Sequence, residues 1–173
     1  MSRKVFCIVL LAIIWAPNLW GQEYNNLSKD KEPRGFRGIA WGINLQNRED
    51  MILVSDYGKR DGRKFYKRKG DKLFIGPVKI SDLRYVSYMN SFYQVSFSLG
   101  FPQTDRNTLK DVFIKAYGTP VFHADMYIWE NDNIHITLFP GGVFYTYLPI
   151  HKSFQKEYDE DHQRRIRDGV DDL

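Results

Sequence analysis

The most constraining feature of this sequence is a strict alternation of apolar and polar side chains near its centre. Over residues 93–99 the apolar members are Tyr93, Val95, Phe97 and Leu99, and the polar members are Gln94, Ser96 and Ser98. Successive side chains of a β-strand point to opposite faces of a sheet, so a period of two separates these two sets. The pattern predicts an antiparallel sheet with one buried and one solvated face.

Further runs of strand length accompany this segment. Together with it they are Met51 to Val54, Leu73 to Ile75, Leu83 to Met89, Phe92 to Leu99, Met126 to Glu130, Ile134 to Phe139 and Phe144 to Leu148. Turn-forming residues separate them at Asp61-Gly62, Gly70-Asp71, Gly76-Pro77, Asn90-Ser91, 131–133 and 140–142. Gly, Pro, Asn and Asp favour tight turns, so the sequence predicts about seven strands joined largely as hairpins.

One amphipathic helix is predicted over about 104–117. Its apolar residues recur at the i, i+3, i+4, i+7 spacing of a helix face, and they are Leu109, Val112, Phe113 and Ala116. Thr104 or Asp105 is the expected N-cap. Gly118 is the expected left-handed stop, and Pro120 prevents the helix from continuing.

The last part of the chain, residues 151–173, is almost wholly charged. Phe154 and Tyr158 are four residues apart, as are Ile166 and Val170, so we expect a helix that packs through its first turns and then projects or frays. Strand runs broken by isolated helices predict an α+β fold. We expect a single domain over 35–150 and a charged helical tail.

The N-terminus has the pattern of a secretory signal peptide. Arg3 and Lys4 precede an unbroken apolar run from Val5 to Ala16, which is shorter than the roughly 20 residues that span a bilayer as a helix. We place the signal peptide at residues 1–21, although the residues before Gly21 fit the usual cleavage pattern poorly, and an uncleaved anchor is the alternative. The sequence therefore predicts export to the periplasm or the medium.

The exported chain would contain no cysteine, because the only one, Cys7, lies within the signal peptide. It would fold without disulfides, on an apolar core to which the 16% of aromatic residues contribute most. Loss of two basic residues lowers the formal charge from +4 to +2, which gives no reason to expect nucleic acid as a partner. Residues 22–34 are polar and are expected to form a flexible lead-in.

The stretch GFRGIAWGINLQN combines three glycines with two large aromatic residues. Its spacing does not match the dinucleotide-binding fingerprint, and no Walker lysine follows. We therefore expect a structural role in which Phe36, Ile39 and Trp41 anchor the first strand. Gly38 and Gly42 would let the backbone pass close to these rings. A binding loop is the alternative.

Two short motifs carry a resemblance. The motif F-x-G-I-x-W-G after the signal peptide, followed later by Tyr117-Gly118-Thr119-Pro120 and a Trp-bearing strand, resembles small exported bacterial proteins of unassigned function. The segment from Gly118 to Trp129 is similar to the small outer-membrane assembly lipoproteins of the BamE/SmpA type, although the lipidated cysteine and the paired N-terminal helices of that family are missing. The resemblance implies an accessory role in the bacterial envelope and carries over no catalytic residue.

A basic run at residues 59–72 holds eight cations and two acids. On a hairpin, Lys64, Tyr66 and Arg68 would share one face, and Phe65 and Lys67 the other. With Arg63, this surface could bind anionic lipids or acidic glycans. Alternatively, it is an exposed hairpin whose lysines discourage edge-to-edge pairing.

Two strands carry pairs of aromatic residues that share a face. Tyr127 and Trp129 form one pair, and Tyr145 and Tyr147 form the other. If these strands lie in one sheet, the four rings could line a shallow platform for sugar rings or a partner peptide. The alternative is cross-strand pairing that only stabilises the sheet.

Four residues offer ligand or acid–base groups: His123, Asp125, Glu130 and His135. Their spacing matches no common metal motif, and no nucleophile motif occurs. His135 alternates with two isoleucines, so it should point away from the core. We expect no metal and no cofactor, while a metal-dependent or hydrolytic enzyme remains a rival hypothesis.

These features favour a non-enzymatic binding or accessory protein of the bacterial envelope. The rivals are the enzyme just described and a polyanion or anionic-lipid binder that uses the basic hairpin 59–72. An envelope protein, an anionic lipid or a glycan is the expected kind of partner. No transmembrane span is expected in the mature chain.

Overall fold

The structure is a computed structural model that describes residues 24–57, 62–100 and 102–171. The predicted signal peptide and Asp61 lie outside the described residues. In chain order the elements are η1 (Lys29–Lys31), β1 (Gly35–Phe36), β2 (Ile39–Ala40), η2 (Leu45–Asn47), β3 (Met51–Asp56), β4 (Arg63–Arg68), β5 (Phe74–Ile75), β6 (Val78–Tyr88), β7 (Ser91–Leu99), α2 (Pro102–Tyr117), β8 (Val121–His123), β9 (Met126–Glu130), β10 (Ile134–Phe139), β11 (Gly142–Tyr147) and α3 (Leu148–Asp171).

Nine strands form one sheet in the order β3-β4-β6-β7-β11-β10-β9-β8, with β5 paired to β6 beside this path. Each of these pairs is antiparallel, which confirms the predicted α+β fold with a mainly antiparallel sheet. The apolar runs did not reveal β4 or β8. β4 consists mostly of Lys and Arg, and β8 is only three residues long.

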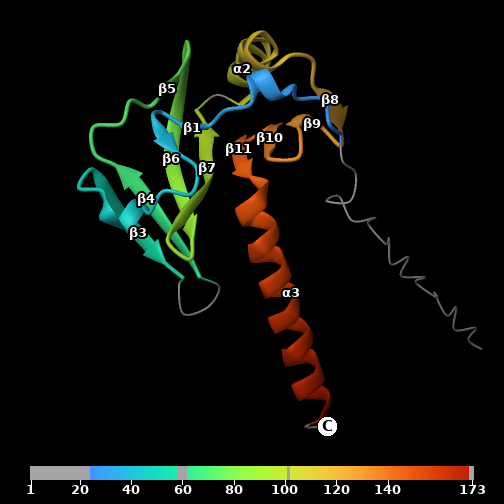
Figure 1. Cartoon of the computed structure of the whole chain (residues 1–173). Coiled ribbons are helices and arrows are strands. Elements are labelled where there is room, and N and C mark those ends of the chain that lie inside the picture. The colour runs from blue at the N-terminus through green and yellow to red at the C-terminus, as the bar shows by residue number, and fades with distance from the viewer. Residues whose placement is uncertain (1–23, 58–61, 101, 172–173) are drawn as a thin grey trace, which may run out of the picture.

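One face of the sheet is covered by α2 and carries the main core (Figure 1). Leu109 and Phe113 are buried, and the Phe113 ring lies 5.5 Å from Trp129 and 5.7 Å from Tyr145. Ala116, expected on this buried stripe, is exposed instead. The stripe continues instead at Tyr117, four residues after Phe113, whose ring packs against Phe113 and Trp129 in the last turn.

The ends of α2 match the prediction at one end only. The helix begins at Pro102, before both Thr104 and Asp105, so neither is its N-cap. Gly118 has a φ of 93°, and its N–H donates to the carbonyl oxygen of Ile114 at 2.9 Å. This confirms the left-handed stop, because a residue with a Cβ rarely adopts that φ.

The predicted alternation in β7 holds for its last apolar residues but not for Tyr93. Phe92 pairs with Ser87 and Gln94 pairs with Val86, so Tyr93 is an extra residue in a β-bulge. Its ring joins the smaller apolar cluster on the other face of the sheet, beneath α3. The local sequence gives no sign of this change of face.

The turn between β6 and β7 lies one residue before the predicted position. Its central residues are Met89 and Asn90, with φ of 46° and 67°. Positive φ at both positions is typical of the two-residue hairpin turn that fits the twist of a sheet. Ala124 and Asp125, with φ of 46° and 60°, make the same kind of turn between β8 and β9.

The glycine-rich stretch forms a small hairpin, β1–β2, followed by Trp41. The Trp41 ring is partly buried, lies 4.7 Å from Phe92, and donates its Nε1–H to the Pro33 carbonyl oxygen at 2.8 Å. It is therefore an anchor, as predicted. The glycines act differently from the prediction, because a Cβ at Gly38 or Gly42 would meet nothing within 4 Å. Both glycines have positive φ, which is the property required of them here.

The described part of the lead-in also differs from the prediction. Leu27 is buried in the main core, and its N–H donates to the Glu130 carbonyl oxygen at 2.9 Å. The segment thus runs along β9 as a strap. One apolar side chain and a few amides are enough to dock it, although its composition is polar.

The C-terminal helix α3 leaves the end of β11 and projects well beyond the sheet (Figure 1). Its first turns pack through Phe154, whose ring lies 5.2 Å from Tyr88. This confirms a helical tail that docks at its start. Within the part of the chain that is described, no helix has the length and apolar character needed to cross a membrane.

Candidate functional site

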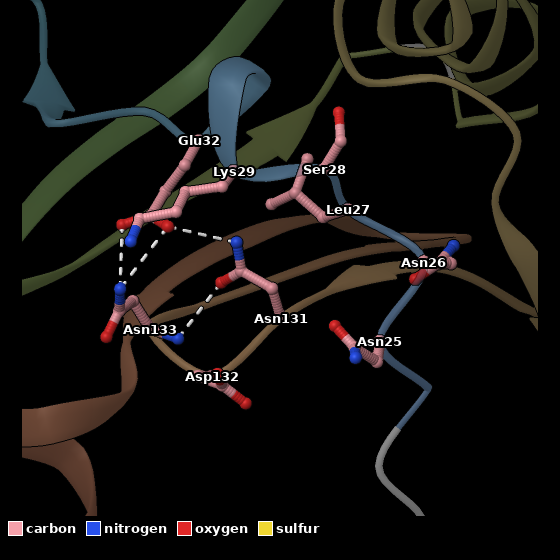
Figure 2. A pocket seen from close by; sticks show the side chains of 9 residues that line it. All are labelled: Asn25, Asn26, Leu27, Ser28, Lys29, Glu32, Asn131, Asp132 and Asn133. Atoms are coloured by element: carbon pink, nitrogen blue, oxygen red, sulfur yellow. Dashed lines mark hydrogen bonds between the residues drawn. The ribbon is translucent and has the colours of Figure 1, made fainter.

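A polar pocket of about 340 Å³ lies between the N-terminal strap and the turn that joins β9 to β10 (Figure 2). Its lining residues are Asn25, Asn26, Leu27, Ser28, Lys29, Glu32, Asn131, Asp132 and Asn133. Sequence reasoning missed this site, because strap and turn are about a hundred residues apart in the chain. The abundance of asparagine in both segments was the available signal.

The amides on the turn side of the pocket are occupied by the protein itself. Asn131 donates to the Glu32 carboxylate at 3.0 Å and Asn133 donates to it at 3.1 Å (Figure 2). The Asn131 side-chain oxygen accepts the backbone N–H groups of Asn133 and Ile134, both at 2.9 Å. These contacts lock the turn and join it to the strap.

Asn26 fixes the other end of the strap. Its amide nitrogen donates to the carbonyl oxygens of Thr119 and Ile128, each at 3.0 Å, and its side-chain oxygen accepts the N–H of Glu130 at 2.9 Å. The groups left to meet a ligand are on exposed residues such as Asn25, Lys29 and Asp132. The pocket is therefore primarily a joint between strap and sheet.

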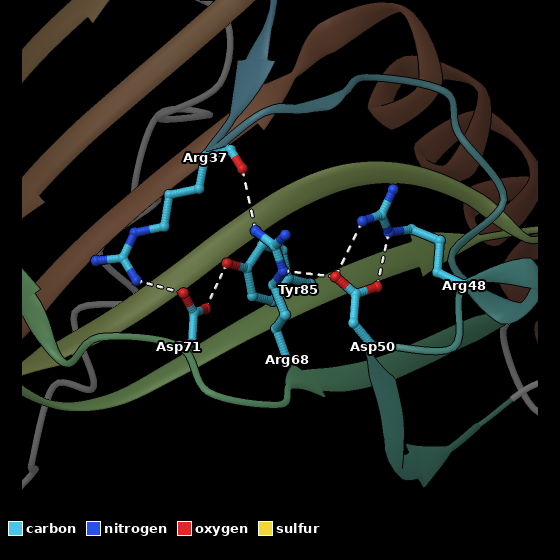
Figure 3. A network of polar contacts seen from close by, with 6 residues as sticks. All are labelled: Arg37, Arg48, Asp50, Arg68, Asp71 and Tyr85. Carbon is cyan, nitrogen blue, oxygen red and sulfur yellow. Dashed lines mark hydrogen bonds and ion pairs between the residues drawn. The ribbon is translucent and has the colours of Figure 1, made fainter.

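A network of arginines and aspartates connects the β1–β2 hairpin to the end of β4 (Figure 3). Arg37 donates to Asp71 at 2.6 Å, and Asp71 accepts the Tyr85 hydroxyl at 2.5 Å. Arg68 donates to Asp50 at 2.7 Å, and Arg48 donates to the same carboxylate. Each of the three arginines donates to a carboxylate, so the network is a structural clamp.

The pKa values in the clamp follow its geometry. Hydrogen bonds from Arg48 and Arg68, with their charges, outweigh desolvation and lower the pKa of Asp50 to about 2. Burial and the neighbouring Asp71 raise the pKa of Tyr85 far above its ordinary value. Asp50 is therefore an anion and Tyr85 a neutral donor at any physiological pH.

The four candidate cations of the predicted basic surface are held in contacts within the fold, while Lys59 and Arg60 lie outside the described residues. Lys64 pairs with Asp56 at 3.9 Å, Lys67 with Asp82 at 2.8 Å and Arg68 with Asp50, and Arg63 lies over the Phe154 ring at 5.0 Å. Tyr66, which was predicted to lie on this surface, is buried. β4 is also an interior strand between β3 and β6, so its lysines do not guard the edge of the sheet.

The predicted aromatic platform lies on the face that α2 covers. Trp129 and Tyr145 are buried, and the Trp129 Nε1–H donates to the Gly118 carbonyl oxygen at 2.7 Å. Tyr127 and Tyr147 are partly buried against the same core. The four rings do share one face, but that face is the interior, so cross-strand packing is their role.

The four predicted acid–base residues separate into two places. Asp125 pairs with Arg106 at 3.0 Å, and the ring of His123 lies 6.4 Å from that of Tyr24. Glu130 and His135 face each other across β9 and β10 and form a hydrogen bond. Within the described residues, no three His, Cys, Asp or Glu side chains are grouped so that they could hold a metal ion.

The Glu130–His135 pair has a third member that sequence reasoning missed. Thr137 Oγ1 lies 2.6 Å from His135 Nε2, while Glu130 contacts His135 Nδ1. Carboxylate, imidazole and hydroxyl in this order can activate a hydroxyl as a nucleophile. Thr137 is only 7% exposed, and none of the three residues lines the polar pocket. The i, i+2 spacing of His135 and Thr137 in one strand was the available signal.

An edge strand of the sheet exposes three consecutive apolar side chains. β3 ends the strand order, and Ile52, Leu53 and Val54 in it are 47%, 48% and 45% exposed. Tyr57 beside them is also exposed. An edge strand presents unpaired backbone groups and is usually protected by Lys, Pro or a β-bulge. β3 has no Lys or Pro, and its pairing with β4 is irregular between Leu53 and Ser55.

Comparison with known proteins does not assign this arrangement to any family. No family model, no curated protein and no solved structure matches the chain.

Proposed function

We propose that this chain is an exported, non-enzymatic binding protein of the bacterial envelope that takes up an extended protein segment along β3. The observation that supports it is the apolar, lysine-free edge at the end of the sheet. A segment added there would gain main-chain hydrogen bonds from the edge and apolar contacts from alternate side chains. The rest of the molecule is the scaffold that holds this edge in place.

The edge also suggests the chemistry of its partner. Two exposed acids flank the three exposed apolar side chains: Glu49 just before the strand, and Asp56 at its end, which also pairs with Lys64 at 3.9 Å. An extended segment with an apolar centre and basic ends would complement this pattern. The strand at the opposite edge, β8, is three residues long, so it has too few backbone groups to pair with an extended segment.

A defined peptide tests the proposal. We expect a fluorescent peptide with the sequence Lys-Val-Thr-Val-Thr-Val-Lys to bind the processed protein, measured by fluorescence anisotropy. Hydrogen exchange at the β3 amides should slow when it binds. Leu53→Lys should weaken binding at least about tenfold, because a lysine on the edge opposes strand addition.

Phe122→Lys on the opposite edge is the matched control, since Phe122 is also an exposed apolar residue of an edge strand. This variant should bind as the unmodified protein does. Equal loss in both variants, or exchange that slows at β8 instead of β3, would reject β3 as the site.

The proposed location rests on the first 21 residues and has its own test. Cell fractionation should recover the protein outside the cytoplasm with Gln22 as its first residue, as mass spectrometry can measure. A cytoplasmic protein that retains Met1 would contradict export.

Hydrolysis is the second candidate, because Glu130, His135 and Thr137 are aligned as described above. Incubation with p-nitrophenyl acetate should then leave an acetyl group on Thr137, detected by peptide mass spectrometry and absent from His135→Ala. An unmodified Thr137 would exclude this candidate.

A further inference from the structure

The hairpin formed by β5 and the start of β6 has one buried and one exposed face. Ile75 packs against the main core, and Val78, its partner across the hairpin, is buried in that core. Phe74 and Lys79 form the next pair, so their side chains share the other face. Phe74 is 53% exposed, and Lys79 is exposed as well. The ring of Phe74 is therefore an apolar group that the fold leaves in contact with solvent.

Arg37 fixes the backbone that carries this ring. Its guanidinium donates to the carbonyl oxygens of Lys72 and Phe74, at 2.7 and 2.6 Å, and to the Asp71 carboxylate at 2.6 Å. Leu73, which lies between the two bonded carbonyl groups, is 40% exposed. The exposed apolar side chains are thus held on a fixed backbone, so covering them would cost little conformational entropy.

The charges around these apolar side chains are mainly positive. Lys72 and Lys79 are exposed on the two strands of the hairpin, and the acid that precedes Lys72 is held by an arginine of the clamp. On α2, which lies beside the turn of the hairpin, Asp105 is partly buried and Asp111 lies 3.6 Å from Lys110. This end of the molecule therefore combines exposed apolar groups with an excess of positive charge.

We propose that this hairpin contacts the surface of an anionic lipid bilayer. Phe74 and the exposed Gly76–Pro77 turn would enter the headgroup region, and Lys72 and Lys79 would pair with lipid phosphates. Apolar burial and attraction to anionic headgroups add to each other at a membrane surface. A stable contact with a folded protein would need about 800 Å² on each partner, which is far more than two half-exposed side chains provide.

The inference assumes the envelope location proposed above, but it does not depend on β3. Figure 1 shows β5 at the end of the molecule opposite to the one toward which α3 projects. A molecule bound through the hairpin would therefore direct α3 away from the bilayer. Peptide binding at β3 and lipid binding at the hairpin involve different residues, so each can fail without the other.

Sedimentation with lipid vesicles tests the proposal on the processed protein. It should bind vesicles of phosphatidylglycerol and phosphatidylcholine, and bind vesicles of phosphatidylcholine alone at least about tenfold more weakly, because the lysines need anionic headgroups. Lys72→Glu with Lys79→Glu should lower binding to the anionic vesicles by roughly 30-fold or more, since each lysine contributes about a factor of five.

Lys152→Glu with Lys156→Glu is the matched control, because it changes the net charge equally at exposed positions of α3. This variant should bind the anionic vesicles as the unmodified protein does. Equal losses in the two double variants would show attraction without a defined site and would overturn the proposal. Failure of the unmodified protein to bind anionic vesicles, or equal binding to neutral ones, would overturn it as well.

A fluorescent label tests whether the apolar part of the hairpin enters the bilayer. The chain has no cysteine after Cys7, so Phe74→Cys gives the processed protein a single site for an NBD label. Its emission should increase and shift to the blue with anionic vesicles. The same label on Phe144→Cys, at another exposed aromatic position, should not respond. An unchanged spectrum at position 74 while the protein binds vesicles, or an equal shift at position 144, would reject the hairpin as the membrane contact.

Discussion

The two faces of the sheet differ in what they bury. The face beneath α2 is a dry aromatic core in which Phe113, Trp129 and Tyr145 pack edge to face. The opposite face is polar at its centre, where Glu130, His135 and Thr137 form a hydrogen-bonded chain, and the first turns of α3 pack on a small apolar cluster beside it. The residues that could take part in a reaction therefore lie on the second face, while packing on the first face determines stability. Mutations can test this division directly.

The largest effect is expected from Phe113→Ala beneath α2. Loss of a fully buried ring should lower the free energy of unfolding by about 3–5 kcal/mol, measured by urea denaturation. Phe144→Ala on the opposite face removes a ring of the same size that is 39% exposed, and it should cost less than half as much. Similar losses in the two variants would show that the faces do not divide stability as proposed.

The second effect depends on pH and concerns His151 at the start of α3. Burial, with smaller contributions from the charges of His135 and Arg63, lowers the pKa of His151 to about 4. His151 binds a proton near pH 6.5 in the unfolded chain and only near pH 4 in the folded chain. The stability that the neutral His151 contributes is therefore fully present above pH 6.5 and is lost as the pH falls from 6.5 to 4.

At pH 4.5 this proton linkage should remove about 2–3 kcal/mol of the stability present at pH 7, at about 1.4 kcal/mol per unit of pKa difference. His151→Leu should lose that share of the pH dependence, while His123→Leu, at an exposed position, should retain it. The measurement is urea denaturation at the two pH values. An unchanged pH slope in His151→Leu would show that another group is responsible.

The local pattern predicted the parts of this fold that depend on local chemistry. β9 and β10 have the predicted bounds, and Gly118 ends α2 with the expected positive φ. The bulge at Tyr93 was not predictable in the same way. It depends on how β6 pairs with β7, and a single strand's alternation contains no information about its partner.

The same limit explains what was missed at the candidate sites. The exposed run in β3 was visible in the sequence, but its place at the edge follows from the strand order, which is a tertiary property. The aromatic pairs were assigned correctly to one face, yet only the position of α2 makes that face the interior. Asn26 was placed in a flexible segment because its partners, Thr119, Ile128 and Glu130, are far away in the chain.

A smaller effect is expected from the hydrogen-bonded chain on the second face. Thr137→Val keeps the shape of the side chain but removes the hydroxyl next to His135, so it should cost about 1 kcal/mol. Thr146→Val is the matched variant, because the Thr146 hydroxyl accepts a hydrogen bond from Gln94 at 3.1 Å in an equally buried place. Chemical denaturation should give similar losses for both. A gain in stability for Thr137→Val alone would mean that the fold sacrifices stability at this hydroxyl, as functional sites often do.

The smallest effect is expected at the solvent-exposed end of the second face, where Asp82 pairs with Lys67 at 2.8 Å and with Arg84 at 2.6 Å. Desolvation alone would raise the pKa of Asp82, but the hydrogen bonds and charges of these two cations outweigh it and lower the pKa. The charged Asp82 therefore stabilises the fold above the unfolded pKa near 4, and this contribution is lost as pH falls through the lower folded value.

Asp82→Asn should cost less than about 1 kcal/mol at pH 7, because exposed ion pairs contribute little. The difference should shrink in 0.5 M NaCl and at pH 3, whereas the loss in Phe113→Ala should be insensitive to salt. A salt-insensitive loss of several kcal/mol in Asp82→Asn would place a stability-determining contact on the polar face and break the division between the two faces.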